Sequence, residues 1–461
     1  MANAAAAAPD PADSQTRGSL LVIFLTVFID LLGFGMVLPL LPIYASDFGL
    51  AQHGWQIGAL MASFSLMQFL FAPLWGRLSD RIGRRPVLIV GLLGSVVFYA
   101  LFGVASIWKS LPLLFVARIG AGIAGATIST AQAYIADTTT PQTRAKGMAL
   151  IGAAFGLGFT FGPLLAAAAI LSSGTNVSNS PWPGFVASGL SAVALLLAIF
   201  RLPESLKPGH AKMQLGIFNP QALSDSLSTP TIGALLVTSF IGVVSFGGYE
   251  TTIALLLADK RHGFSFSLIQ VTLFFAFIGV VLSLVQGGIV RRLSGRIPES
   301  GMATIGALLT IVGFVMLSQA RPSRQLTALL MTPVFGGWYE VAWPTTWDTT
   351  FLMTASAIEV TGFAFMTPSL QSLISRRSDP AKQGGILGVS QGVSALARII
   401  GPLVAVPLFT NVSHTSPYFA SMGLMVLGLA ALLIGARGGR DYGEPTRHQP
   451  EAQAKESADG G

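Results

Sequence analysis

Five ionisable residues lie inside long apolar segments of this chain. Asp30 is at the centre of one apolar run and Arg118 is in another, while Glu250, Glu359 and Arg398 lie in the second half. Ionisable groups at the depth of a bilayer are costly and usually mark a functional site. A carboxyl group removed from water favours its protonated form, which suits a carrier of protons. We therefore expect these five side chains to bind protons or a small molecule.

Structural interpretations of the same residues stay open. Asp30 could be hydrogen-bonded and support a helix break at the glycines that follow it. Arg118 could form a fixed ion pair inside the protein, and Glu359 could pair with Arg398 on a neighbouring segment. Three glutamines in apolar segments are further candidates for the lining of a polar cavity: Gln68, Gln286 and Gln391.

Residues for enzyme or metal chemistry are scarce. The chain has no cysteine and five histidines, and all five histidines fall in expected loops or in the C-terminal tail. No pair of them has the spacing of metal ligands, and no phosphate-binding Walker loop is present. We expect no metal site, no cofactor and no use of ATP.

The ionisable residues must be positioned by membrane-spanning helices. Of the 461 residues, 52% are hydrophobic and only 10% are charged, and the mean hydropathy is +0.67. Soluble domains carry about 25% charged residues, and a helix needs about 20 apolar residues to cross a bilayer. The apolar windows predict twelve spans, at 19–41, 55–75, 86–107, 111–134, 146–170, 183–200, 231–258, 267–290, 301–319, 351–374, 384–408 and 416–436.

These spans predict an all-α membrane protein with two six-helix bundles. The expected parts are a disordered N-terminal tail at 1–18, a first bundle at 19–200, a central linker at 201–230, a second bundle at 231–436 and a C-terminal tail at 437–461. An insertion rich in tryptophan, at 322–350, would lie on the outer face of the second bundle.

The basic residues indicate how the helices are oriented. Most of the 27 Lys and Arg residues fall in the two tails, the linker and the loops on that same side of the membrane. Positive residues collect on the cytoplasmic side of membrane proteins, so we expect both termini and the linker in the cytoplasm. This placement accounts for the net charge of +7 without a nucleic-acid partner. The expected location is a cell membrane, which is the inner membrane in a Gram-negative cell.

The two halves share a weak internal repeat. Gly162–Pro163 and Gly401–Pro402 occupy matching places in glycine-rich spans, and Pro141 and Pro380 precede them at equal distances. Gly158 is four residues from Gly162, and such spacing lets helix backbones approach closely. Packing alone and packing with a role in gating are equally open. Parallel repeats around a central site are typical of transporters.

The segment from Gly76 to Pro86 combines glycines, one acid and several arginines, in the order Gly-Arg-Leu-Ser-Asp-Arg-Ile-Gly-Arg-Arg-Pro. Its two glycines permit tight turns, and Asp80 at a helix boundary can be held by neighbouring arginines. Such a cluster could hold two bundles together in one state and release them in another; a plain row of cytoplasmic arginines is the alternative. The candidate gating residues, with one from the end of the fourth span and one from the loop after it, are Gly76, Asp80, Arg81, Gly83, Arg84, Arg85, Asp137 and Arg144.

This segment resembles the signature of the loop between the second and third helices of the major facilitator superfamily. The run from Arg118 to Ala126 is similar to the superfamily's buried-arginine motif, and the run from Gly158 to Pro163 resembles a motif of its antiporters. Phe28–Pro42 and Tyr134–Thr140 are similar to the tetracycline and multidrug proton antiporters. Phe98 and Leu282 stand where the tetracycline exporters carry an aspartate and a histidine, which argues against tetracycline as the substrate.

The resemblance implies a secondary active transporter that exports small hydrophobic or cationic compounds, such as drugs, in exchange for protons. We expect it to work as a monomer. A facilitator or proton symporter for a small nutrient or metabolite is the alternative. A membrane receptor without transport activity, or an enzyme, is a further alternative that no residue pattern supports.

Overall fold

The computed structural model describes residues 11–48, 54–139, 144–172, 179–206, 230–260, 263–320, 328–334, 337–343, 347–378 and 383–438. Within these residues, 12 helices are long and apolar enough to cross a membrane. The expected all-α membrane fold is therefore confirmed. Most of the central linker, the extreme N-terminus and the C-terminal tail lie outside the described residues.

The first half of the chain forms six spans. They consist of α1 (Pro11–Val37) with α2 (Leu41–Asp47), α3 (Gly54–Ile82), α4 (Arg84–Trp108), α5 (Leu111–Gly125) with α6 (Ile128–Thr138), α7 (Arg144–Ser172) and α8 (Trp182–Arg201). The first helix begins at Pro11, inside the segment that the sequence suggested would be a disordered tail. Proline is well suited to the first turn of a helix, and the polar residues after it extend the apolar helix by several turns.

The second half forms six more spans. They are α10 (Pro230–Ala258), α11 (Leu268–Leu284) with η2 (Val285–Val290) and α12 (Arg291–Leu293), α13 (Glu299–Ser318), α14 (Trp347–Arg377), α15 (Gln383–Asn411) and α16 (Ser416–Gly438). The segment η2 is a π-helix that continues α11. Such segments are rare and occur often at functional sites.

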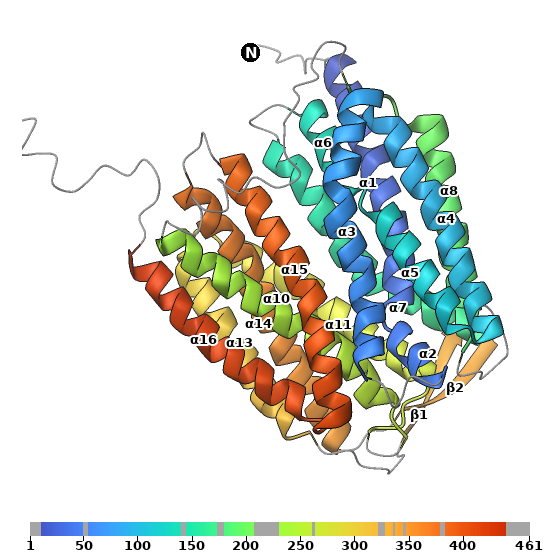
Figure 1. Ribbon diagram of the computed structural model, residues 1–461, viewed down its shortest axis with the longest axis vertical. Helices are drawn as coiled ribbons and strands as arrows, with labels where there is room; N and C mark the ends of the chain where they lie inside the picture. The colour runs from blue at the N-terminus through green and yellow to red at the C-terminus, as the bar shows by residue number, and fades with distance from the viewer. Residues whose placement is uncertain are drawn as a thin grey trace, which may run out of the picture.

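Each half packs mainly on itself. In the N-terminal bundle, α1 packs on α7 and α8, and α4 packs on α5 and α8. In the C-terminal bundle, α10 packs on α15 and α16, and α13 packs on α14 and α16. Two seams join the bundles, where α3 packs on α15 and α7 packs on α11 (Figure 1).

A two-stranded hairpin occupies the insertion between α13 and α14. Strand β1 (Ala328–Val334) pairs antiparallel with β2 (Gly337–Trp343), and β1 reaches α7 of the other bundle. The sequence predicted the insertion but not its strands, because no alternation of polar and apolar residues marks them. We call this end of the molecule the hairpin end, and the end with the loop between α3 and α4 the Arg84 end.

Among the described residues, the two bundles meet closely toward the hairpin end. A Cβ atom added to Gly58 of α3 would lie 2.7 Å from the carbonyl oxygen of Pro402 in α15, and one on Gly54 would meet Thr410. Toward the Arg84 end, a Cβ atom on Gly152 or on Gly388 would meet nothing within 4 Å. Figure 1 shows α3 and α15 side by side in the lower half of the view and apart above. The structure is therefore closed at the hairpin end and parted at the Arg84 end.

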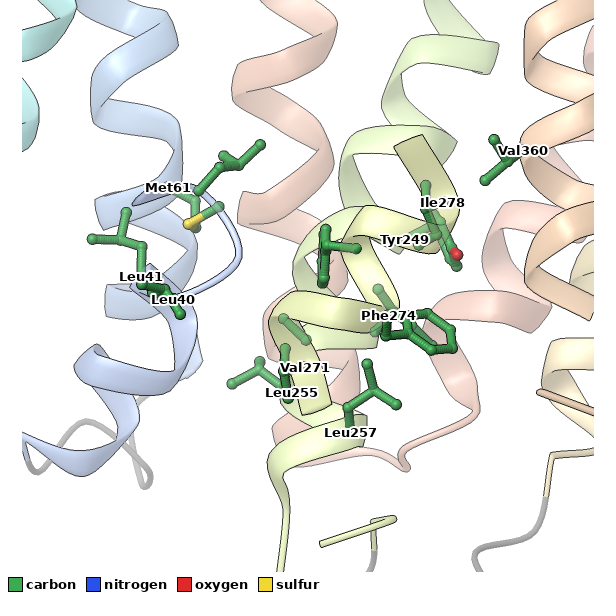
Figure 2. Close-up of a cluster of buried hydrophobic side chains, with 14 of the residues drawn as sticks. Leu40, Leu41, Met61, Tyr249, Leu255, Leu257, Val271, Phe274, Ile278 and Val360 are labelled. Atoms are coloured by element: carbon green, nitrogen blue, oxygen red, sulfur yellow. The ribbon is translucent and has the colours of Figure 1, made fainter. Parts of the chain in front are cut away.

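Apolar side chains fill both bundles and the seam between them. Figure 2 shows Leu41 and Met61 of the first half facing a cluster that includes Leu255 and Phe274 of the second half. On the outside, large apolar side chains are exposed, such as Phe200 at 76% and Leu427 at 63%. Such an exterior suits a lipid solvent rather than water.

Candidate functional site

Three charged residues predicted from the sequence meet at the boundary between the bundles. Arg118 is on α5 of the N-terminal bundle, while Glu250 is on α10 and Arg398 is on α15 of the C-terminal bundle. Glu250 interacts electrostatically with both guanidinium groups. The fold thus assembles a central site from residues that are far apart in the sequence.

Arg118 is the most deeply buried cation of this site. Its side chain is only 2% exposed, and its guanidinium carbon lies 4.5 Å from the centre of the Phe64 ring. Its Nε and Nη1 atoms have no hydrogen-bond partner among the described residues. Buried donors without acceptors are costly, so this guanidinium is suited to receive an acceptor group from a bound molecule.

Asp30 lies inside the N-terminal bundle and away from the central site. Ser191 of α8 donates a hydrogen bond to its Oδ1 atom at 3.1 Å, and Ser95 of α4 interacts with the same carboxyl group. Tyr99 of α4 interacts electrostatically with both Asp30 and Arg118. The tyrosine therefore links the acid to the central site, and no pattern in the sequence marked these partners.

Glu359 lies inside the C-terminal bundle. Its side chain is 0% exposed, and neither carboxylate oxygen has a hydrogen-bond partner in the described structure. An ion pair with Arg398 would have been a structural role for this acid. The structure does not form that pair, because the electrostatic partner of Arg398 is Glu250.

The three glutamines predicted to line a polar cavity lie at separate places in the structure. Gln68 donates its Nε2 hydrogen to the carbonyl oxygen of Gly125 at 3.3 Å, at the break between α5 and α6. Gln286 is in the π-helix η2, and Gln391 is exposed on α15. The structure thus gives Gln68 a role in holding a helix break and does not join the three residues in one site.

The predicted gating segment forms a charge network centred on Arg84. The Nε atom of Arg84 lies 3.0 Å from Oδ2 of Asp137, Nη1 donates to Oγ of Ser79 at 2.7 Å, and the same group pairs with Asp80. Each of these contacts lies within the N-terminal bundle. In this conformation the segment therefore ties α3, α4 and α6 together, and its contacts with described residues do not bridge the bundles.

Glu204, which follows α8, completes this network. Its Oε1 accepts from the backbone N–H of Arg84 at 2.9 Å, and its Oε2 accepts from that of Arg85 at 3.1 Å. An anion at a helix N-terminus is stabilised by the free N–H groups and the helix dipole. Sequence reasoning missed this residue, although an acid directly after a span is a usable signal.

The two glycines of the segment behave differently. Gly83 has a φ of 107° between α3 and α4, which a residue with a side chain rarely adopts. Gly76, which was expected to form a turn, lies within α3, because the helix continues to Ile82 before the chain reverses. Arg81 is exposed, and Arg85 donates to the carbonyl oxygen of Ile199 at 2.6 Å.

The remaining loop residue, Arg144, is the first residue of α7, and its side chain lies outside the described structure. The described residues include no group of three or more His, Cys, Asp or Glu that could hold a metal ion.

The glycine motifs form two matching helix crossings. A Cβ atom on Gly162 of α7 would lie 2.7 Å from the backbone carbon of Gly35 in α1. In the second half, a Cβ atom on Gly401 of α15 would lie 3.0 Å from the backbone nitrogen of Gly248 in α10. Gly158 also meets α1, and Pro163 and Pro402 lie within their helices directly after these crossings.

Residues 23–353 match the family model of the Major Facilitator Superfamily, and the chain belongs to this family. It is 31% identical over 430 residues to the tetracycline resistance protein, class C, of Escherichia coli, with 92% of this chain and 98% of that protein covered. It is 30% identical over 448 residues to the major facilitator superfamily domain-containing protein 10 of Mus musculus, with 87% and 89% covered.

Solved structures agree with this assignment. The crystal structure of the human organic anion transporter MFSD10 (TETRAN) is 27% identical and has a TM-score of 0.63, with 90% of this chain and 99% of that one covered. The nucleoside transporter NupG, at 15% identity, has a TM-score of 0.67 over 91% and 99% of the two chains and shares the fold alone. The protein is therefore a multi-pass membrane transporter for small molecules and not an enzyme.

Proposed function

We propose that the protein exports small hydrophobic or cationic compounds across a cell membrane in exchange for protons. The observation that carries this proposal is the central site, where the carboxyl group of Glu250 faces Arg118 across the boundary between the bundles and Arg398 within its own bundle. Transporters of this kind bind their cargo near the midplane between two repeats. A cation and a proton would compete for the same carboxyl group, and competition of this kind couples their movements in opposite directions.

Asp30 is the second acid in the proposed exchange. It is linked to Arg118 only through Tyr99, which interacts with both groups. A proton on Asp30 would change the electrostatic environment of this tyrosine, and the tyrosine in turn faces Arg118. We assign Asp30 a role in proton binding and Arg118 a role in passing its charge state to the cargo site.

The Arg84 end would face the cytoplasm, since basic residues concentrate in its loops. The parted bundles at that end would then give the cytoplasm access to the central site, as expected for an exporter that is loading its cargo. Both termini would lie on this side, and a single copy of the chain would hold the complete site. In a Gram-negative cell the membrane would be the inner one.

Proton symport of a small organic anion is the second candidate. Arg118 favours it, because two of its buried donor atoms have no acceptor among the described residues, and a relative of known structure is described as an organic anion transporter. Protonation of Glu250 would free both guanidinium groups for an anion. Proton and anion would then move together, so the direction of proton movement separates the two candidates.

The test uses proteoliposomes in a weakly buffered medium and follows the pH of the medium with an electrode. Ethidium that enters in exchange for protons should acidify the medium, whereas fluorescein that enters with protons should make it more alkaline. Protein-free liposomes and the variant Asp348→Asn, which changes a carboxyl group at the start of α14, are the controls. No proton movement with either probe, in vesicles that do transport the probe, would refute proton coupling and favour a facilitator.

Asp30→Asn should abolish this proton movement while the protein stays monodisperse and folded. The amide keeps the hydrogen bond with Ser191 but cannot take up a proton. Proton movement equal to that of the unmodified protein would remove Asp30 from the mechanism and leave it a structural role.

A further inference from the structure

A second polar cluster lies inside the C-terminal bundle and apart from the central site. We call it the Glu359 cluster, and it consists of Tyr249 on α10, Ser356 and Glu359 on α14, and Tyr418 on α16. All four side chains are at most 1% exposed. Tyr249 interacts electrostatically with Glu359 and Tyr418 and lies within hydrogen-bonding range of Ser356.

The side-chain oxygen atoms of this cluster lack hydrogen-bond partners within the described residues. Within the described residues, no hydrogen bond is formed by either carboxylate oxygen of Glu359 or by the hydroxyl oxygens of Tyr249, Ser356 and Tyr418. Ser356 lies within range of Tyr249, and Thr252 lies within range of Tyr418. Buried polar atoms nearly always have partners in folded proteins. A group of four such side chains at one place therefore marks a site where a bound species is expected.

The helices around Glu359 supply no counterion within the described structure. From α10 it faces Tyr249 and Glu250, and Tyr418 of α16 faces Tyr249. The described part of α11 contains no ionisable residue. Helix α13 presents backbone, since a Cβ atom on Gly313 would lie 2.6 Å from the Cα atom of Glu359. The cation on α15, Arg398, interacts with Glu250 instead.

An ionised Glu359 would thus be a buried charge with a like charge nearby and, among the described residues, no cation and no donor held in place. Such a charge is strongly disfavoured in an apolar interior. A proton removes the cost, because it neutralises the carboxyl group and needs neither a cavity nor a set of ligands. The three hydroxyl groups of the cluster can then accept the carboxyl hydrogen or donate to its carbonyl oxygen.

Tyr249 and Glu250 are neighbours on α10, but they face different sites. The tyrosine belongs to the Glu359 cluster, and the glutamate belongs to the central site. The two carboxyl groups, Glu359 and Glu250, repel each other when both are ionised. Because like charges at close range are disfavoured, a proton on Glu359 favours the ionised Glu250 that pairs with Arg118 and Arg398.

We propose that Glu359 holds a proton in this conformation, and that the Glu359 cluster is a proton-binding site separate from the cargo site. Its charge is coupled to that of Glu250, which follows Tyr249 of the cluster on α10. The part that this proton plays in transport rests on the proposed proton coupling. Its presence on Glu359 does not, and it can be measured without any cargo.

Infrared spectroscopy of the purified protein at neutral pH tests the proposal, because a protonated carboxyl group has a carbonyl stretch of its own. Glutamate labelled with ¹³C separates the glutamate bands from those of aspartate. We expect the unmodified protein to show a protonated glutamate band that Glu359→Gln removes. The band should persist in the matched variants Glu250→Gln and Asp348→Asn. A band that persists in Glu359→Gln, or no such band in the unmodified protein, would overturn the proposal.

Two further measurements separate a proton site from a folding defect and from a sodium site. If Glu359→Gln does not yield a monodisperse protein, Tyr249→Phe replaces it and should shift the band without removing it, whereas an unchanged band would overturn the cluster. Spectra in sodium chloride and in choline chloride should be the same. A band that appears only when sodium is absent would show a sodium site and refute the proton site.

The two proposals can fail separately. A protonated Glu359 in a protein that moves no protons in vesicles would leave the Glu359 cluster standing and would refute the proposed exchange. Proton movement in vesicles, by a protein whose Glu359 is not protonated, would support the proposed exchange and refute the proton site in the Glu359 cluster.

Discussion

The two bundles place an ion pair at the same position but with the charges reversed. In the N-terminal bundle, Arg84 at the start of α4 pairs with Asp137 at the end of α6. In the C-terminal bundle, Glu299 at the start of α13 pairs with Arg376 at the end of α14, at 2.8 Å. The repeat thus preserves the contact between the third and fourth spans of each half and not the residues that make it.

The two pairs differ in burial. The Arg84 side chain is 9% exposed and has Asp137, Asp80 and Ser79 around it, whereas the Arg376 side chain is 50% exposed. Buried charges depend on their partners, while exposed pairs contribute little. The N-terminal bundle is therefore fixed at its Arg84 end more firmly than the C-terminal bundle.

The buried acids differ in the same direction. Asp30 in the N-terminal bundle receives a hydrogen bond from Ser191, whereas Glu359 in the C-terminal bundle has no partner for either oxygen within the described structure. The first half therefore holds its buried acid with a hydroxyl donor, whereas the second half leaves its buried acid open to the proton proposed above.

The largest expected effect comes from Arg84→Ala. It removes the contacts of Arg84 with Asp137, Asp80 and Ser79. Because both acids are partly exposed, the free energy of unfolding should fall by about 2–3 kcal/mol. Arg376→Ala, in the exposed pair, should cost about 0.5 kcal/mol or less. Thermal unfolding in detergent measures both, and equal losses would refute the claim that the two ends are fixed to different degrees.

Replacing the glycine at the helix crossing of either half should lower the stability by a similar amount. Gly162→Ala places a Cβ atom against the backbone of α1, and Gly401→Ala does the same against α10. Overpacking of this kind costs about 1–3 kcal/mol. Gly152→Ala on the same helix as Gly162 is the matched control, because it meets open space and should be neutral or slightly stabilising. A control that destabilises as much as the other two would show that the helix, and not the crossing, is sensitive.

A substitution where α7 packs on α11 should have a smaller effect on the balance between conformations. Thr160 Oγ1 of α7 lies 2.8 Å from Ser283 Oγ of α11, and Thr160→Val removes this hydrogen bond, which contributes about 0.6 kcal/mol in membrane proteins. The variant should shift the population away from the conformation that is parted at the Arg84 end. Spin labels on Gly152→Cys and Gly388→Cys report this separation, since the chain has no cysteine of its own. An unchanged distance distribution would show that the pair does not hold the seam.

The smallest expected effect is an exchange of charges in the C-terminal bundle. The double variant Glu299→Arg with Arg376→Glu gives this bundle the polarity of the N-terminal one. Each single variant should cost a few tenths of a kcal/mol, and the double variant should recover most of the loss. A double variant less stable than either single one would show that the helix dipole, which favours Glu299 at the start of α13, outweighs the pair.

Several features of the site were predictable from the sequence, and others were not. Asp30, Arg118, Glu250, Glu359 and Arg398 were recognisable because a charged residue in an apolar run is conspicuous. Their partners were not, because serine and tyrosine occur in many helices without a role. Ser191, Tyr99 and Tyr418 acquire one only when helices from distant parts of the chain pack around an acid.

The gating segment shows the same limit. Its motif identified Arg84 and Asp80, yet it left open whether they bridge the bundles or hold one of them together. The structure favours the second answer for this conformation and adds Glu204, which lies far from the motif in sequence. Residues near in sequence form a motif, but only packing decides which helix ends come near each other.

The sequence by itself determined the lipid environment, the twelve spans and the twofold repeat. Each of these depends on local composition and periodicity, and the length of an apolar run is dictated by the thickness of the bilayer. Only the tertiary structure decided that Glu250 faces two arginines, that Asp30 is hydrogen-bonded and that Glu359, among the described residues, is not. Those outcomes depend on which face each helix turns to its neighbours, and small rotations of a helix change its partners without changing its hydropathy.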